Sequence, residues 1–225
     1  EKFAPGANVK STLSDDKIKE LMRKLKENDI YTIARIVTFK DTVYVNQYPE
    51  RIIVYKNGNV PYKSTDNLYW ASPHDRQLWE YDVEVAKEAA DYGFNEIQFD
   101  YVRFPALSKS MEEKIDFRNT EGESEAEAIQ KFLKYAYEEL SKKEVYVAAD
   151  IYGQVGSVSD DMGIGQYWEA VSNVIDYICP MMYPSHYGNN VYGLSVPDAY
   201  PYETIYYCTR DSIKRNTNIS TPAEI

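Results

Sequence analysis

The stretches NEIQFDYVRFP (residues 95–105) and EVYVAADIYG (residues 144–153) decide the fold of this chain. Each is a short run of apolar, β-branched and aromatic residues, which is typical of a strand covered on both faces in a parallel sheet. Each also carries an aspartate near its carboxyl end, Asp100 in the first and Asp150 in the second. A helix-length amphipathic segment separates the two, so they are predicted to be successive parallel strands.

Strands and helices alternate on either side of these two segments. The Asn57-Gly58 pair lies between the short apolar runs of RIIVYKNGNVPYK (residues 51–63), which predicts a small hairpin in a loop. Ser72 followed by Pro73 is expected to begin one helix, and Gly93 is expected to end it. Ser124 and Glu127 fit a capping box. The remaining predicted strands are 30–39 and 174–184, and the predicted helices are 14–28, 73–92, a segment from 124 to about 140, 166–173 and 202–215.

This alternation predicts parallel βαβ units with right-handed crossovers, and hence an α/β fold. Four such units are visible, whereas a closed eight-stranded barrel needs twice as many. The chain also opens on a helix that ought to follow a strand. We therefore expect one domain over residues 1–225, a TIM-type (β/α) barrel that is incomplete in this chain, lacking its first strands and its last strand or strands. A smaller open α/β sheet is the alternative.

The charge balance excludes several classes of partner. The sequence holds 25 Lys and Arg against 36 Asp and Glu, a formal charge of -11, which repels nucleic acid and anionic lipid heads. No stretch approaches the roughly 18 apolar residues of a spanning helix, so this domain is not expected to insert into a membrane. Its 22 tyrosines suit a carbohydrate partner, because the ring has an apolar face and a polar tip, although they suit protein interfaces equally.

Metal and cofactor motifs are weak in this sequence. With two histidines and no paired motif, a zinc site is not expected. Gly163-Ile164-Gly165 is half of a dinucleotide fingerprint and does not directly follow a strand. Cys179 and Cys208 are too few for a disulfide framework. We predict neither a metal nor a cofactor, and the chain starts at Glu1 without a signal segment, which is expected of a processed or trimmed start.

Ligands of parallel α/β folds bind at the carboxyl ends of the strands, where Asp100 and Asp150 are predicted to lie. Side chains at one height on nearby strands can hold carboxylates roughly 5 to 10 Å apart, a range that includes both glycosidase geometries. Arg103 could keep Asp100 ionised as a nucleophile, and apolar neighbours could raise the pKa of Asp150 for a general acid. The alternative is structural: Asp100 and Arg103 form an ion pair and Asp150 caps a helix.

Aromatic and polar residues near the predicted strand ends could bind a sugar. A lone histidine is more often structural, and a tryptophan in a loop can equally serve packing. Arg35 and Lys40, near the end of the first predicted strand, are expected to be charge partners rather than reactive groups. The candidate substrate-binding residues are Tyr101, Arg103, Tyr152, Tyr183, His186, Tyr187 and Trp70.

The segments NEIQFDYVRFP, VAADIYG, DDMGIGQ and CPMMYPSHY resemble a bacterial family of glycoside-hydrolase domains that long carried no assigned function and is related to the α-amylase-type barrels. The resemblance spans nearly the whole chain. It implies that the strands carrying Asp100 and Asp150 are the fourth and fifth of the barrel, with Asp100 at the nucleophile position. Asp150 stands where those relatives usually have a glutamate, so the acid is less certain than the nucleophile. Members are typically exported or attached to the cell surface.

Three functions are open at this point. The first is a hydrolase that cleaves a polysaccharide by a two-carboxylate, retaining mechanism. The second is a non-catalytic carbohydrate-binding domain on the same scaffold, which would show exposed aromatics and one acid buried in an ion pair. The third is a structural surface or spore-coat protein, with tyrosines spread evenly over its outside. Substrate, linkage and oligomeric state do not follow from the sequence.

Overall fold

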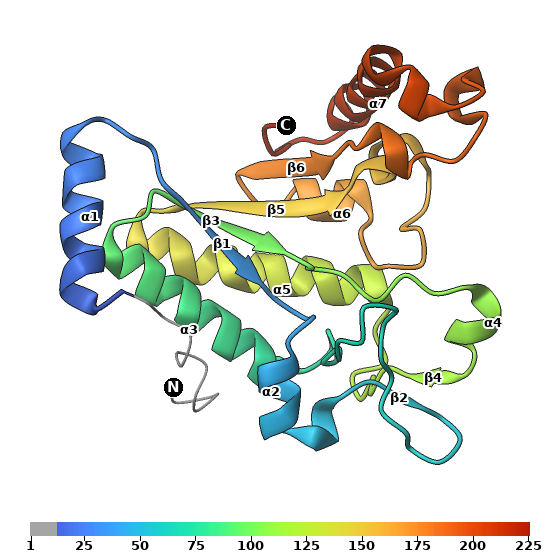
Figure 1. Cartoon of the computed structure of the whole chain (residues 1–225), viewed down its shortest axis with the longest axis horizontal. Helices are drawn as coiled ribbons and strands as arrows, with labels where there is room; N and C mark the ends of the chain where they lie inside the picture. The colour runs from blue at the N-terminus through green and yellow to red at the C-terminus, as the bar shows by residue number, and fades with distance from the viewer. Residues whose placement is uncertain (1–12) are drawn as a thin grey trace.

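The computed structural model describes residues 13–225, and its centre is a four-stranded parallel sheet. The strands are β1 (Ile33–Val37), β3 (Glu96–Asp100), β5 (Tyr146–Tyr152) and β6 (Tyr177–Met181), and they lie side by side in that order (Figure 1). Each strand is thus the neighbour of the one before it in the sheet. The two long crossover helices, α3 (Arg76–Tyr92) and α5 (Glu125–Leu140), lie against the same face.

Each successive strand is added on the same side of the sheet, and the crossover helices lie on one face of it. This is the arrangement of a (β/α) barrel rather than of a doubly wound sheet. The sheet does not close within residues 13–225. Its β6 edge is extended by a parallel bridge between Tyr177 and Glu224, which follows α7 (Pro201–Asn216). The expected incomplete TIM-type barrel is therefore confirmed as an open segment of that fold.

Alternation along the strands separates the core from the opposite face of the sheet. Ile97 and Phe99 of β3 are fully buried toward the helices, and Val147 and Ala149 of β5 lie beside them. The ring of Phe132 on α5 sits among Phe39, Trp79 and Phe99, with centroids 5.1 to 5.8 Å apart. Edge-to-face contacts of this kind stabilise a core beyond the area that they bury.

The other face of the sheet is partly open, which corrects the expectation that 30–39 is a buried strand. Ile33 and Val37 of β1 are 46% and 38% exposed, and Arg35 lies between them on the same face. In a closed barrel this face would point into the interior. Here nothing in residues 13–225 covers it at β1, so polar side chains can reach solvent there.

Helix ends follow local capping rules. Ser124 and Glu127 form the predicted capping box at the start of α5. Gly93 ends α3 in the left-handed region, at φ 101°, as a C-terminal glycine should. The start of α3 differs from the prediction, because Asp75 rather than Ser72 is its N-cap and accepts the backbone N–H of Gln77.

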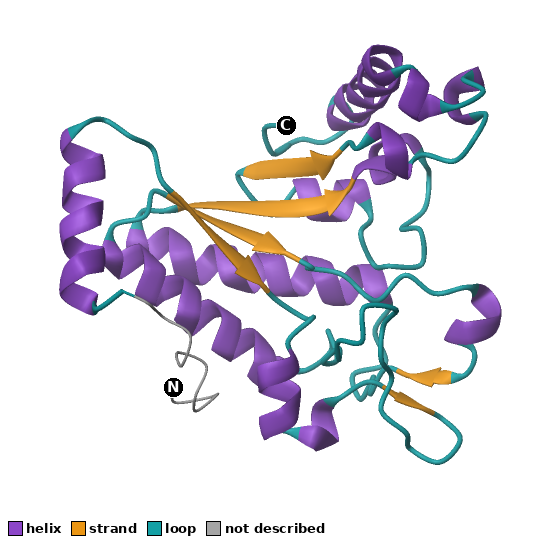
Figure 2. Ribbon diagram, viewed as in Figure 1, coloured by secondary structure: helices purple, strands orange, loops and turns teal. Residues whose placement is uncertain are grey.

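Long loops follow β1 and β3 and pack on each other (Figure 2). The first contains α2 (Thr42–Gln47), η2 (Pro49–Arg51) and β2 (Val54–Tyr55); the second contains α4 (Lys109–Glu112) and β4 (Ile115–Asp116). β2 pairs antiparallel with β4, so the two loops share a small sheet. The turn at Asn57-Gly58 is present, with Tyr55 N–H donating to the Val60 carbonyl, but β2 takes its main partner from the other loop.

The remaining elements are the helices predicted at 14–28 and 166–173, which agree within a few residues, and short 3-10 helices that the sequence did not predict. They are α1 (Asp15–Glu27), η3 (Ser141–Lys143), η4 (Gly153–Ser157), α6 (Trp168–Ser172), η5 (Pro184–His186), η6 (Val191–Gly193) and η7 (Pro197–Ala199). Cys179 and Cys208 are both free thiols. Within residues 13–225 no helix combines the length and the apolar character needed to cross a bilayer.

Replacing Phe132 by alanine is expected to lower the free energy of unfolding by about 3–5 kcal/mol, because the substitution opens a cavity between the sheet and its helices. Urea unfolding followed by circular dichroism measures the change. Tyr137→Ala on the solvent side of the same helix, at a residue 38% exposed, is the matched control and should cost less than about 1 kcal/mol. Equal losses in both variants would contradict this view of the core.

Candidate active site

The pairing of β3 with β5 brings the two predicted acids together. Phe99 is in register with Ala149, so Asp100 and Asp150 follow at the same height on adjacent parallel strands. Both side chains lie on the face of the sheet away from α3 and α5, and both are mostly buried, at 5% and 8% exposure. The two carboxylates therefore share one end and one face of the sheet.

Arg35 on β1 connects the two acids. Its guanidinium forms an ion pair with Asp100 Oδ2 through Nη2, and its Nε lies 3.9 Å from Asp150 Oδ2. Each ion-pair contact spans at most about 4 Å, and one guanidinium lies between the two acids. The nearest oxygens of the two carboxylates are therefore within about 10 Å of each other. The arginine side chain is 53% exposed, so it forms the solvent side of this group.

Asp150 sits where its charged form is disfavoured. Burial, followed by the nearby charge of Asp100, raises the pKa of Asp150 to about 6, against the opposing effect of Arg35. Gln98 Nε2 donates to Asp150 Oδ1 at 2.8 Å and holds the carboxyl group in place. The pKa of Asp150 is thus raised, as expected from its apolar neighbours in the sequence.

Asp100 has a different environment. One of its carboxylate oxygens accepts the Arg35 ion pair, and the other accepts the backbone N–H of Tyr101 at 2.6 Å. That second bond exists because Tyr101 adopts φ 53°, a left-handed conformation that a tyrosine rarely takes. The chain turns sharply directly after Asp100, and backbone strain of this kind is often found at functional sites.

Arg103 forms no direct ion pair with Asp100, although the charge of Asp100 partly opposes the effect of burial on the pKa of Arg103. It donates instead to the Phe104 carbonyl at 2.9 Å, and its guanidinium lies over the rings of Trp70 (5.0 Å) and Tyr101 (5.4 Å). The positive φ of Tyr101 ends the strand, so the alternation assumed from an extended backbone fails there. Burial lowers the pKa of Arg103.

Trp70 and Tyr187, two predicted sugar-binding residues, lie in the interior. Trp70 is 2% exposed beneath Arg103, and its ring meets Tyr101 edge to face. Tyr187 is 7% exposed, and its hydroxyl donates to Cys208 Sγ at 2.9 Å. Neither ring offers an open face to a sugar.

Other predicted residues remain at the rim. Tyr183 is 52% exposed after β6, and His186 packs edge to face against it at 5.1 Å. Tyr152 is half-buried at the end of β5, in register with Met181. These rings, with Tyr101, are the aromatic surfaces nearest to the strand ends.

The Gly163-Ile164-Gly165 segment has a structural part in the site. Gly165, at φ 75°, passes so close to α5 that a Cβ there would lie 2.8 Å from the Glu125 carbonyl. The next residue, Gln166, is fully buried and donates to the carbonyls of Asp150 and Val102. Its amide thereby ties the ends of β5 and β3 together.

Gln98 and Gln166 escaped the sequence analysis, and Arg35 was expected only as an unassigned charge partner. Gln98 lies two residues before Asp100, so strand alternation could have placed it on the same face. Gln166 gave no comparable signal, because its partners are backbone carbonyls distant in sequence. Among residues 13–225 no group of three or more His, Cys, Asp or Glu side chains could hold a metal ion.

Comparison with known proteins agrees with this geometry. Residues 4–224 match the model of a family described as "Putative glycosyl hydrolase domain". A hypothetical protein from Ruminiclostridium thermocellum is 35% identical, with a TM-score of 0.52; the match covers 65% of this chain and 67% of that one. Among curated proteins no match was found.

More distant solved structures are also similar. A class V chitinase from Pseudomonas fluorescens is 15% identical over 79% of this chain and 44% of its own, with a TM-score of 0.47. An α-galactosidase from Thermus thermophilus is 10% identical over 75% of this chain and 30% of its own, with a TM-score of 0.49. The chain spans less than half the length of either enzyme. By the match over residues 4–224, the chain belongs to the family described as "Putative glycosyl hydrolase domain".

Proposed function

We propose that this domain hydrolyses glycosidic bonds of a polysaccharide, with Asp100 as the nucleophile and Asp150 as the general acid. The observation that carries the proposal is the pair itself: two carboxylates at one height on adjacent strands, in unlike environments. Cleavage needs one carboxylate that is ionised and one that is protonated, because positive charge develops at the anomeric carbon while the leaving oxygen takes a proton.

The hydrogen bonds support this division of roles. Asp100 accepts an ion pair from Arg35 and a hydrogen bond from the backbone N–H of Tyr101, and these two donors hold its carboxylate in place. Asp150 has a raised pKa, so a large fraction is protonated in mildly acidic solution. In a retaining reaction Asp100 would attack the anomeric carbon, and Asp150 would protonate the leaving oxygen and then take a proton from the attacking water.

One observation favours a second function. Asp100 is 5% exposed and is held in an ion pair, while Tyr183 is 52% exposed. This combination was the one expected of a carbohydrate-binding domain without activity. A nucleophile must present a carboxylate oxygen to the anomeric carbon of a sugar, whereas a binding domain needs no such access.

The proposal extends to location. A hydrolase of polysaccharides meets its substrate outside the cell or on the cell surface, so we place this domain there. Fractionation of the producing bacterium followed by immunoblotting would test the assignment. A signal confined to the cytosolic fraction would contradict it.

Asp100→Asn is expected to lower kcat/KM on a cleaved polysaccharide by about 10³-fold or more, because an amide cannot form the glycosyl intermediate. Asp150→Asn should lower it by about 10²- to 10⁴-fold, the usual contribution of a general acid. Release of reducing ends from a panel of soluble polysaccharides measures both.

Asp91→Asn is the matched control, since Asp91 is an exposed aspartate at the carboxyl end of α3, the end away from the N-cap. Its turnover should equal that of the unchanged protein. If the unchanged protein cleaves no polysaccharide but binds one, and Asp100→Asn binds it equally well, the domain is the carbohydrate-binding alternative.

The carboxyl group of Asp150 is expected to titrate with a pKa of about 6, so activity should fall as the pH rises above that value. Arg35→Gln removes a cation that favours the ionised form and should raise this pKa further. Asp100→Asn removes a like charge and should lower it. Carbon-detected NMR of the aspartate carboxyls measures the pKa of Asp150 in the unchanged protein and in both variants. A change of this pKa in the same direction in both variants would be inconsistent with the pair as described.

A further inference from the structure

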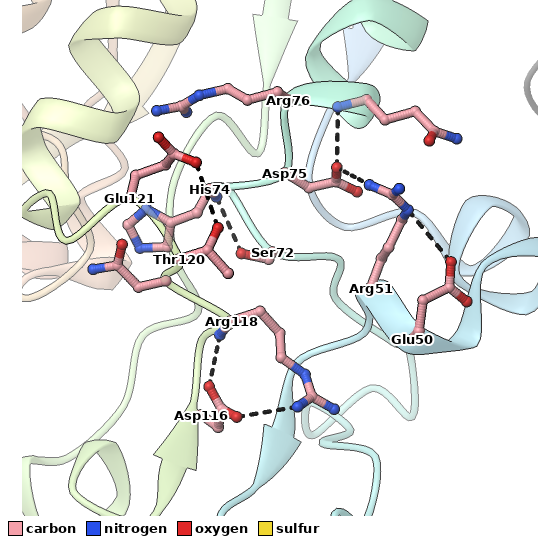
Figure 3. Close-up of a pocket in the computed structure, with 12 residues that line it drawn as sticks. Glu50, Arg51, Ser72, His74, Asp75, Arg76, Asp116, Arg118, Thr120 and Glu121 are labelled. Carbon is pink, nitrogen blue, oxygen red and sulfur yellow. Dashed lines mark hydrogen bonds and ion pairs between the residues drawn. The ribbon is translucent and has the colours of Figure 1, made fainter.

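A polar cleft of about 640 Å³ opens between the two long loops, on residues that the candidate active site does not use (Figure 3). One wall is η2 with the start of α3, and the other is the segment that follows β4. Figure 3 shows Arg51 facing Thr120 across the hollow, with Asp75 and Arg118 between them. The volume lies within the range of small-ligand sites.

The charges around this cleft nearly cancel. Arg51, Arg76 and Arg118 supply three cations, and the carboxylates are Glu50, Asp75, Asp116 and Glu121. Burial lowers the pKa of His74, which favours its neutral form. A highly charged anion or cation would therefore meet repelling groups as well as attracting ones, whereas a neutral ligand would not.

Both hydrogen-bond donors and acceptors line the cleft. Arginine presents only donors, a carboxylate presents only acceptors, and the Asn119 amide and Thr120 hydroxyl present both. The hydroxyls of a saccharide each donate and accept, so a saccharide can use both kinds of group from neighbouring ring positions.

The lining is also held in place before any ligand arrives. Arg51 is ion-paired with the buried N-cap Asp75, which also accepts from the Tyr44 hydroxyl at 2.8 Å. Arg118 bonds to Asp116 at 3.1 Å and to Asn59 at 2.6 Å. Fixed side chains lose little conformational freedom on binding, which favours affinity.

A second ion-pair cluster fixes the deeper wall. Glu123, 2% exposed at its side chain, accepts Arg76 at 2.7 Å, Lys131 at 2.9 Å and a His74 ring contact at 3.1 Å. The guanidinium carbon of Arg76 lies over the Trp79 ring, 3.6 Å from its centroid. The planes of Arg76 and His74 are thereby set.

The cleft and the candidate active site are separated by packed aromatic side chains. His74 contacts Phe104, a fully buried ring that also meets Phe117 edge to face. Phe104 follows Arg103, whose side chain covers Trp70 on the side of the acids. One can thus change the cleft without touching Asp100 or Asp150.

We infer that this cleft binds a neutral oligosaccharide, as a saccharide site separate from the acid pair. The identification of the ligand as a saccharide rests on the proposed function. The presence of a polar site for an uncharged ligand does not depend on it. A saccharide held here would keep the polysaccharide near the strand ends, whether or not the acid pair cleaves it.

The test is isothermal titration of the whole chain carrying Asp100→Asn with maltohexaose, cellohexaose and chitohexaose, so that no probe is cleaved. At least one hexaose is expected to bind. Thr120→Tyr, which fills the mouth from an exposed position, should weaken that binding at least tenfold, and Arg118→Ala should do the same. Thr217→Tyr places the same bulk at an exposed residue after α7 and should change nothing.

NMR of the arginine side chains locates the bound sugar. The Nε–H signals of Arg51 and Arg118 should shift on addition of the hexaose that binds, and should stay in place when Thr120 is replaced by tyrosine. Binding that is unaffected by both cleft variants, or no binding of any hexaose, overturns the inference. Loss of turnover in Asp100→Asn with this binding intact separates the two proposals, because only the acid pair is then disabled.

Discussion

Two carboxylates at one height on adjacent strands cannot both be ionised without cost, and the group around Asp100 and Asp150 follows from that constraint. At an effective dielectric constant of about 20, two like charges about 10 Å apart repel by about 1.7 kcal/mol, and by more when they are closer. A cation from a third strand, Arg35, relieves part of this cost. Burial, together with the remaining repulsion from Asp100, raises the pKa of Asp150.

The same constraint explains why the backbone around the pair is so closely held. Any shift between β3 and β5 by one residue would turn one acid into the core, because side chains alternate between the two faces. Gln166 ties both strand ends, and Phe132 fills the space beneath Phe99. Packing on the helix face thus fixes the register that the acids require on the other face.

Much of the fold could be predicted from local pattern. Strand alternation with amphipathic helices, the capping box at Ser124 and the stop at Gly93 are encoded within a few residues of where they act. The pairing of Asp100 with Asp150 followed from the same pattern, since both end buried strands. Arg103 was assigned to Asp100 because an extended backbone was assumed, and the positive φ of Tyr101 removes that assumption.

The rest depends on contacts between distant loops, which no local pattern encodes. Whether Trp70 faces solvent is decided by Tyr101 and Arg103, some thirty residues further along the chain. The polar cleft likewise forms only because β2 pairs with β4, which brings Arg51 opposite Thr120.

These loops bury apolar residues such as Phe39, Ile53 and Phe104 in the same core as the strands, α3 and α5, whereas the polar residues that line the cleft lie outside that core. Their surface can therefore change with little effect on the register of the acids. The acid pair is constrained by the sheet, whereas the cleft is constrained only by loop packing and its own ion pairs. Two sites of such different origin can differ in specificity independently: the chemistry at the strand ends is fixed by the fold, and the saccharide that is held beside it is set by the loops.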